Sequence, residues 1–198
     1  MEATTAAEAA QVQRARRTLP NGIWAMLLFI ATEATLFGTL IGTYFFLQFR
    51  SPRWPPAGIE APSVALPLAL SGALLLTTVP MVLAALAAAR ARTGATWCLV
   101  ALATAIQSGY LAWQIVLYLD DLDKFSPGTT AYGSIYFTLL GADHAHVLVG
   151  ILLNLWVLAR LLGGMTNYRQ VTVRAVSLYW VFVNALTMIV TLTQVSPS

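Results

Sequence analysis

Five long apolar runs constrain this chain more than any other feature of its sequence. They cover roughly residues 22–49, 64–89, 95–119, 132–162 and 171–195. A helix needs about 20 apolar residues to cross the hydrocarbon core of a bilayer. The chain is 58% hydrophobic and only 10% charged, whereas about a quarter of the residues in a soluble domain are charged. The sequence therefore predicts an all-α, polytopic membrane bundle with five transmembrane helices.

The basic residues predict the orientation of this bundle. Cytoplasmic segments of membrane proteins are enriched in Lys and Arg. If the N-terminus is cytoplasmic, the inner segments hold eight of the 11 basic residues, namely Arg14, Arg16, Arg17, Arg90, Arg92, Arg160, Arg169 and Arg174. The outer segments hold Arg50, Arg53 and Lys124. This bias predicts an N-in, C-out topology. The basic residues lie in short, scattered clusters, unlike the dense basic patch of a nucleic-acid-binding protein.

Two further features bear on the domain organisation. Residues 1–21 are predicted to form a polar cytoplasmic segment, and residues 22–198 a single five-helix domain. The first apolar run is too long for a cleaved signal peptide, so we expect it to be a mature membrane span.

Cys98 is the single cysteine, so an intramolecular disulfide is excluded. We expect Cys98 to be a buried structural thiol.

Glu33 is the most conspicuous polar residue within an apolar run. It lies about eleven residues into the first span, or roughly 16 Å along a helix. Large apolar side chains are expected around it, and the opposite side is small, with Gly38 and Gly42 at a spacing that allows close helix packing. We therefore predict that the helix packs against a neighbour through the side with small residues. On the side that carries Glu33, desolvation is expected to keep the carboxyl largely protonated. Lipid headgroups, protons and a partner subunit are the candidate contacts of Glu33, and the alternative is a protonated or paired carboxyl that only fixes helix packing.

Polar side chains also form one stripe on each of the last three predicted spans. At 100° per residue, each set below shares one helix face. The sets are Gln107, Tyr110, Gln114 and Tyr118; Tyr136, Asp143, His146, Gly150 and Asn154; and Ser177, Trp180, Asn184, Thr187 and Thr191. We expect interhelical hydrogen bonds between these stripes, and one stripe is expected to face another subunit.

The residues of the chain do not predict a catalytic or metal centre of its own. His144 and His146, the two histidines, point about 160° apart on a helix, so they cannot bind one metal from the same face. Ser134 has only these histidines, on its own helix, as candidate bases, and this arrangement does not suit a hydrolytic dyad. No Gly-rich phosphate loop is present.

Several segments together resemble subunit III of the heme-copper oxidases, the cytochrome c oxidase family, in its short five-helix form. The run Leu28-Phe29-Ile30-Ala31-Thr32-Glu33 is similar to the family's apolar stretch that ends in Ser or Thr and then Glu. The other matching segments, in the family's order, are residues 54–58, residues 132–139 with Gly141 and His146, and residues 176–183.

This resemblance implies a non-catalytic subunit that packs beside core subunits I and II. Heme and copper are expected in the core subunit, and no cofactor is expected in this chain except bound phospholipid. Glu33 matches the family's carbodiimide-reactive carboxyl, and His146 matches a family histidine. The implied role is to bind lipid and to support proton uptake and stability during oxygen reduction, in a bacterial inner membrane.

The sequence departs from the family at several ionisable positions. The family usually has His at Asp143, Gly at His144 and Glu at Leu117, and Val181 and Asn184 replace a family His and Asp. The complex that this chain serves is therefore left open among cytochrome c oxidases, quinol oxidases and nitric-oxide-reductase-type complexes. A small proton-coupled transporter that uses Glu33, Asp143 and His146 is the alternative from another class, although no inverted repeat supports it.

Overall fold

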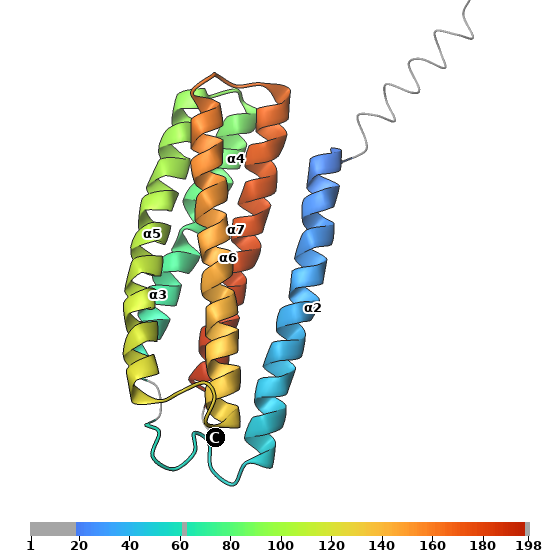
Figure 1. Cartoon of the computed structure of the whole chain (residues 1–198). Coiled ribbons are helices and arrows are strands. Elements are labelled where there is room, and N and C mark those ends of the chain that lie inside the picture. Colours follow the sequence, from blue (N-terminus) through green and yellow to red (C-terminus); the bar gives the residue numbers. More distant parts are fainter. Residues whose placement is uncertain (1–18, 61–62, 197–198) are drawn as a thin grey trace, which may run out of the picture.

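The fold is a bundle of membrane-length helices. The structure is a computed structural model that describes residues 19–60 and 63–196, so the predicted segment of residues 1–21 lies almost wholly outside the described residues. The helices are α2 (Asn21–Arg50), α3 (Ala65–Leu76), α4 (Thr78–Ala89), α5 (Thr93–Lys124), α6 (Ala131–Leu161) and α7 (Asn167–Gln194) (Figure 1). Helices α3 and α4 together form one span, so the described residues contain five helical segments long and apolar enough to cross a membrane. The prediction of an all-α bundle is confirmed.

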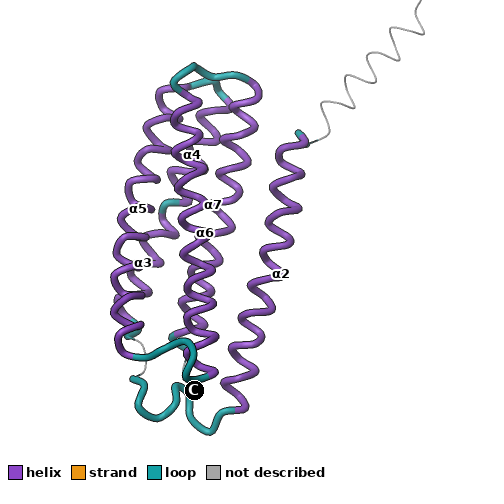
Figure 2. Tube along the Cα trace, in the orientation of Figure 1, coloured by secondary structure: helices purple, strands orange, loops and turns teal. Residues whose placement is uncertain are grey.

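The second span is interrupted near its middle. Helix α3 ends at Leu76 and α4 begins at Thr78, and the tube in Figure 2 shows the interruption as a short non-helical step. Pro80 has no backbone N–H to continue the hydrogen-bond ladder. The side chain of Thr77 donates a hydrogen bond to the carbonyl of Leu74 at 2.6 Å, an oxygen that also accepts from the backbone N–H of Thr77.

Helix α7 occupies the centre of the bundle, and α2 lies at its edge. Helix α7 contacts α2, α3, α4 and α6, whereas α2 contacts only α6 and α7. In Figure 1, α2 accordingly stands beside the group formed by the other spans. Helix α2 is therefore attached to the bundle through only one of its own sides.

The prediction about which side of α2 packs was wrong for the contacts within this chain. Phe37 and Tyr44 are buried on the side that carries Glu33. Gly38 and Gly42 are exposed, and a Cβ built on either would meet nothing within 4 Å. The threonines of the exposed side satisfy their own hydroxyls by donating to carbonyls of the same helix, as Thr39 does to Thr35 at 2.9 Å. The exposed side of α2 therefore needs no partner within the chain, whereas the carboxyl of Glu33 on the packed side does.

Two other expectations are corrected. Cys98 is exposed on the outside of the bundle, because its position on α5 faces away from the neighbouring helices. Helix α5 also continues to Lys124, beyond the predicted end at residue 119. Lys124 forms ion pairs with Asp120 and Asp121 at i,i+4 and i,i+3 spacing, and such pairs favour helix over loop.

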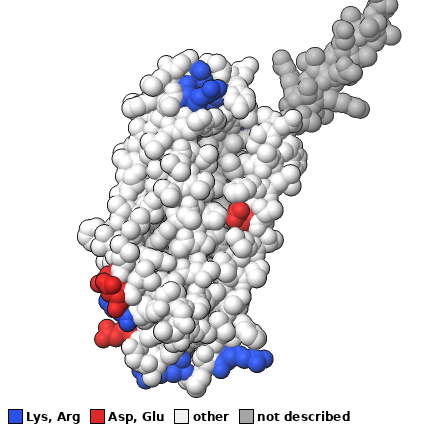
Figure 3. Space-filling model, in the orientation of Figure 1, with Lys and Arg blue, Asp and Glu red and all other residues white. Residues whose placement is uncertain are grey.

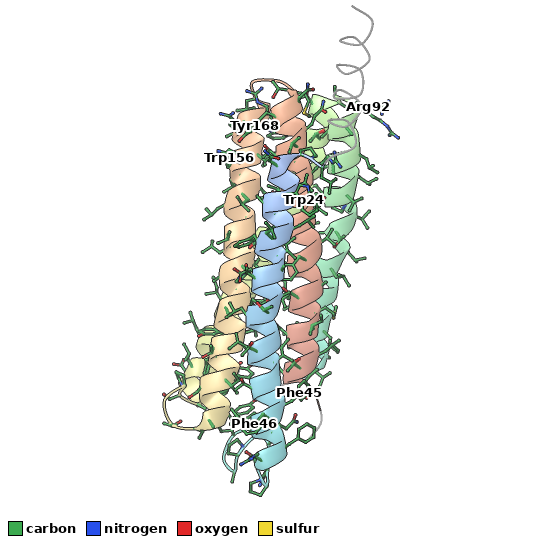
Figure 4. The ribbon with its side chains drawn as sticks, turned by 90° about the vertical axis from the view of Figure 1, so that its right-hand side faces the viewer. Trp24, Phe45, Phe46, Arg92, Trp156 and Tyr168 are labelled. Carbon is green, nitrogen blue, oxygen red and sulfur yellow. The ribbon has the colours of Figure 1, made fainter. Side chains whose placement is uncertain are left out.

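Charged and aromatic side chains mark the two ends of the bundle. Figure 3 shows visible Lys and Arg atoms at both ends and a long face between them that is largely uncharged. In Figure 4, Trp24, Trp156 and Tyr168 lie toward the end that carries Arg92, and Phe45 and Phe46 lie toward the other. Aromatic side chains favour the two membrane–water interfaces. We call these the basic end (Arg90, Arg92, Arg160, Arg169) and the acidic end (Asp120, Asp121, Asp123).

The predicted orientation puts the basic end in the cytoplasm, and cysteine labelling tests it. In a Cys98→Ala background, a membrane-impermeant thiol reagent added from outside should modify Thr129→Cys, in the loop before α6. Gly94→Cys, at the start of α5, should react only after the membrane is permeabilised. Both positions are exposed, so accessibility within the protein does not distinguish them. Labelling of Gly94→Cys alone in intact cells would contradict the N-in, C-out topology.

Candidate functional site

A pair of ionisable side chains joins α2 to the rest of the bundle in the interior of the membrane span. Nε2 of His146 on α6 lies 3.0 Å from Oε2 of Glu33 on α2. Both side chains are mostly buried, with exposed fractions of 16% and 18%. Sequence analysis expected large apolar side chains around Glu33 and grouped it with His146 only in the transporter alternative. The structure shows that the carboxyl also has a polar partner.

The second ring nitrogen of His146 constrains where the proton of this pair resides. Nδ1 lies 2.7 Å from the carbonyl oxygen of Ala142. A carbonyl can only accept a hydrogen bond, so Nδ1 carries a proton. A proton between Nε2 and Glu33 must then come either from the carboxylic acid or from an imidazolium. In both forms one proton joins the two groups and the pair has no net charge, which makes it compatible with the apolar surroundings.

Neighbouring helices hold the imidazole of His146 in place. Phe37 of α2 packs edge-on against the ring, with 5.1 Å between the ring centroids. The hydroxyl of Tyr179 on α7 donates to the carbonyl of His146 at 2.8 Å. The pair therefore lies where α2 meets α6 and α7, the two helices to which α2 is attached.

Asp143 does not join this pair, although it lies one turn earlier on the same helix. It is 1% exposed, and its Oδ1 accepts a hydrogen bond from Thr187 on α7 at 2.8 Å. Its Oδ2 has no hydrogen-bond partner among the described residues. The predicted stripe on α6 thus divides between two partners, since His146 contacts α2 and Asp143 contacts α7.

The other histidine faces a third helix. The ring of His144 packs against Tyr118 of α5, with 5.7 Å between centroids. His144 and His146 therefore have different neighbours, as their spacing on the helix predicts. Among the side chains of residues 19–60 and 63–196, no group of three or more His, Cys, Asp or Glu could hold a metal ion.

A chain of hydrogen bonds crosses the bundle near the interruption between α3 and α4. Trp180 donates to Asn154 at 3.0 Å, and Asn154 donates to Gln107 at 2.8 Å. Gln107 donates to the hydroxyl of Thr77 at 3.1 Å, and Asn184 donates to the same oxygen at 3.2 Å. These bonds connect four of the five spans, so the interruption in the second span is fixed by side chains from three others.

A smaller polar cluster lies toward the acidic end. The hydroxyl of Tyr136 donates to Asp121 at 2.7 Å, and Gln114 donates to the hydroxyl of Tyr110 at 3.2 Å. The hydroxyls of Ser71 and Thr191 lie 2.7 Å apart. The predicted interhelical residues Tyr136, Gln107, Gln114, Trp180 and Asn184 are all buried. Four of them bond to other helices, whereas Gln114 bonds to Tyr110 of its own helix.

This arrangement corrects the expectation that one stripe faces another subunit. Asn184 has no exposed surface, because α7 is enclosed by four other helices and its polar groups have partners there. Sequence analysis did not identify Thr77 or Tyr179 as parts of these clusters. The proline three residues after Thr77 indicated a freed backbone acceptor, but no sequence feature indicated the contact of Tyr179 with His146.

Comparison with known proteins adds a family relationship to this geometry. A sequence model of the family described as "Cytochrome c oxidase subunit III" matches residues 5–194. The chain is 25% identical over 173 residues to cytochrome c oxidase subunit 3 of Thermostichus vulcanus, covering 84% of this chain and 83% of the relative. It is 28% identical over 176 residues to quinol oxidase subunit 3 of Bacillus spizizenii, covering 83% and 80%.

A third relative is much longer than this chain. The heme-copper oxidase subunit I+III of Aeropyrum pernix is 28% identical over 170 residues, which are 79% of this chain but only 20% of that protein. The chain therefore spans about a fifth of the length of this relative.

Gly150 offers a direct test of the packing that positions the α6–α7 hydrogen bonds. A Cβ at this position would lie 2.5 Å from Cζ2 of the Trp180 ring. Gly150→Ala should therefore displace the indole that donates to Asn154 and destabilise the chain by about 1–3 kcal/mol. Gly109→Ala, where a Cβ meets nothing within 4 Å, is the matched control in thermal unfolding of the detergent-solubilised protein. Equal unfolding temperatures for the two variants would contradict the close approach of Gly150 to Trp180.

Proposed function

Because the chain belongs to the family of cytochrome c oxidase subunit III, we propose that it is the non-catalytic subunit III of a heme-copper terminal oxidase in a bacterial inner membrane. Its relatives include subunits 3 of a cytochrome c oxidase and of quinol oxidases. The observation that carries the proposal is the family match over nearly the whole chain. The oxidase reduces oxygen at heme and copper held by the core subunit, and this chain supports that activity without carrying out a redox step itself.

The partners follow from the same relationship. In the Aeropyrum relative the region similar to this chain is part of one protein named subunit I+III, which supports direct packing of this chain against a core subunit I. Subunit II is the second expected partner. The buried polar stripes contribute to the fold of the chain itself, so the docking surface for these partners is formed by outward, largely apolar helix faces.

Within this complex, we assign to the Glu33–His146 pair the role of fastening α2 to α6 and α7. The two groups share one proton and the pair has no net charge, so it joins the helices without placing an isolated charge in the bilayer. Bound phospholipid is expected against the exposed side of α2, where the threonine hydroxyls already have partners. Support of proton uptake by the core subunit then depends on the correct position of α2 and not on a proton that passes through Glu33.

Purification of the chain from its native membranes tests the subunit proposal. A tagged chain should copurify in a fixed ratio with a heme-containing core protein, and the visible spectrum of the preparation should show heme a or heme b. Mass spectrometry of the same preparation identifies subunits I and II. A chain that purifies without any heme protein and carries protons across liposome membranes would contradict the proposal and favour the transporter.

Substitutions of Glu33 test the role of the pair in the assembled oxidase. Glu33→Gln should keep the initial turnover and proton uptake, because the amide can donate to Nε2 of His146 in place of the carboxylic acid. Glu33→Ala leaves His146 without this partner, and it should lower lipid retention and shorten the lifetime of the active complex.

Turnover, proton uptake and the decay of activity with time are the measurements. A fall of more than about tenfold in turnover or proton uptake of Glu33→Gln, equal to about 1.4 kcal/mol of barrier, would show instead that the carboxyl proton is itself on the transfer path. Thr138→Ala is the control, because this exposed threonine of α6 donates to Ser134 of its own helix at 2.7 Å and is not part of α2; it should leave all three measurements unchanged.

A further inference from the structure

Asp143 is a buried carboxyl that the proposed function does not use. Thr187 donates to its Oδ1 at 2.8 Å, while Oδ2 has no partner among the described residues. A carboxylate oxygen without a donor in the interior of a membrane span is costly. The arrangement therefore requires an explanation that the Glu33–His146 pair does not supply.

The groups that face Asp143 do not include a lysine or an arginine. Tyr110 from α5, Tyr179 from α7 and His146 from α6 are the titratable side chains close enough to interact with it electrostatically. Glu33 of α2 lies beyond His146 and is bonded to its Nε2. A carboxylate in the middle of a membrane helix is costly. A neutral carboxylic acid avoids this cost, and its proton then needs an acceptor at Oδ2.

A cavity at the acidic end extends as far as Thr191 on α7. Its volume is about 170 Å³, which holds several water molecules, and Asp120, Asp121 and Lys124 line part of it. Gln114, Thr191 and Gln194 also line this cavity. Thr191 is one helical turn, or about 6 Å, from Thr187, which donates to Asp143.

Hydroxyl groups lie at and next to the wall of this cavity. The hydroxyl of Thr191 lies 2.7 Å from that of Ser71 and donates to the carbonyl of Thr187 at 2.9 Å. Tyr110 is close enough to interact with both Ser71 and Asp143. Gln114, on the cavity wall, donates to the hydroxyl of Tyr110 at 3.2 Å. A hydroxyl both donates and accepts a hydrogen bond, so these side chains and a few waters can relay a proton where amide and apolar groups cannot.

We propose that Asp143 is a proton-binding site in the membrane interior, filled from the cavity at the acidic end through water and the hydroxyls of Thr191, Ser71 and Tyr110. In this reaction one proton leaves a hydronium ion in the cavity and adds to the carboxylate at Oδ2, which leaves water and a neutral carboxylic acid. The site is separate from the Glu33–His146 pair, because Asp143 is directed toward α7 and that pair toward α2.

Infrared spectroscopy of the purified complex tests this site. At neutral pH the wild type should show a carbonyl band in the region of protonated carboxylic acids that is lost in Asp143→Asn and shifted in Asp143→Glu. Asparagine keeps an oxygen that can accept from Thr187, and the glutamate variant identifies the band even if the asparagine variant assembles poorly. On transfer to D₂O the band should shift as the proton exchanges.

Exchange rates in three further variants test the path. Thr191→Val and Ser71→Ala should slow the exchange by about tenfold or more, equal to about 1.4 kcal/mol of added barrier. Thr104→Val is the matched control, because that hydroxyl donates to Val100 of its own helix at 2.7 Å and does not line the cavity. Absence of an Asp143-dependent band would overturn the proton site. Equal exchange rates in the wild type, both path variants and the control would overturn the path.

Discussion

The requirement that polar groups inside a bilayer find partners within the protein governs the whole structure. Water is not present in the hydrocarbon core to satisfy them. The bundle meets this requirement by directing the polar stripes of α5, α6 and α7 inward, where Asn154, Gln107 and Thr77 form one hydrogen-bonded chain. The outward faces are then free to be apolar. Helix α7 lies at the centre because it carries polar groups that only several neighbouring helices can satisfy.

The same requirement explains how α2 is attached. This helix contacts only α6 and α7, and Glu33 is the polar group on its packed side. Its contact with His146 provides a single-proton link without net charge, while Nδ1 of the histidine is fixed by the carbonyl of Ala142. The pair therefore joins the peripheral helix to the bundle without placing an isolated charge in the bilayer.

Much of this structure could be predicted from the sequence, because the signals concerned are local. Apolar run length predicts five spans. Helical periodicity predicts one polar face on each of the last three spans, and these faces carry Gln107, Asp143 and Asn184. The partners of these residues depend on how the helices are rotated against one another, which periodicity does not specify. The packed side of α2 was mispredicted for this reason, since small residues such as Gly38 allow close packing but do not require it. The burial of Cys98 was mispredicted because an apolar residue in a membrane helix can face lipid as well as protein.

The most direct measurement of the central claim is a double-mutant cycle between Glu33 and His146 in the purified complex. The lifetime of the active complex is measured for Glu33→Ala, His146→Ala and the double variant. If the two side chains act as one link between α2 and α6, the double variant should decay no faster than the more damaging single variant, with a coupling energy of about 0.5–3 kcal/mol. Additive losses from the two substitutions would show that Glu33 and His146 act separately, and this would contradict the account.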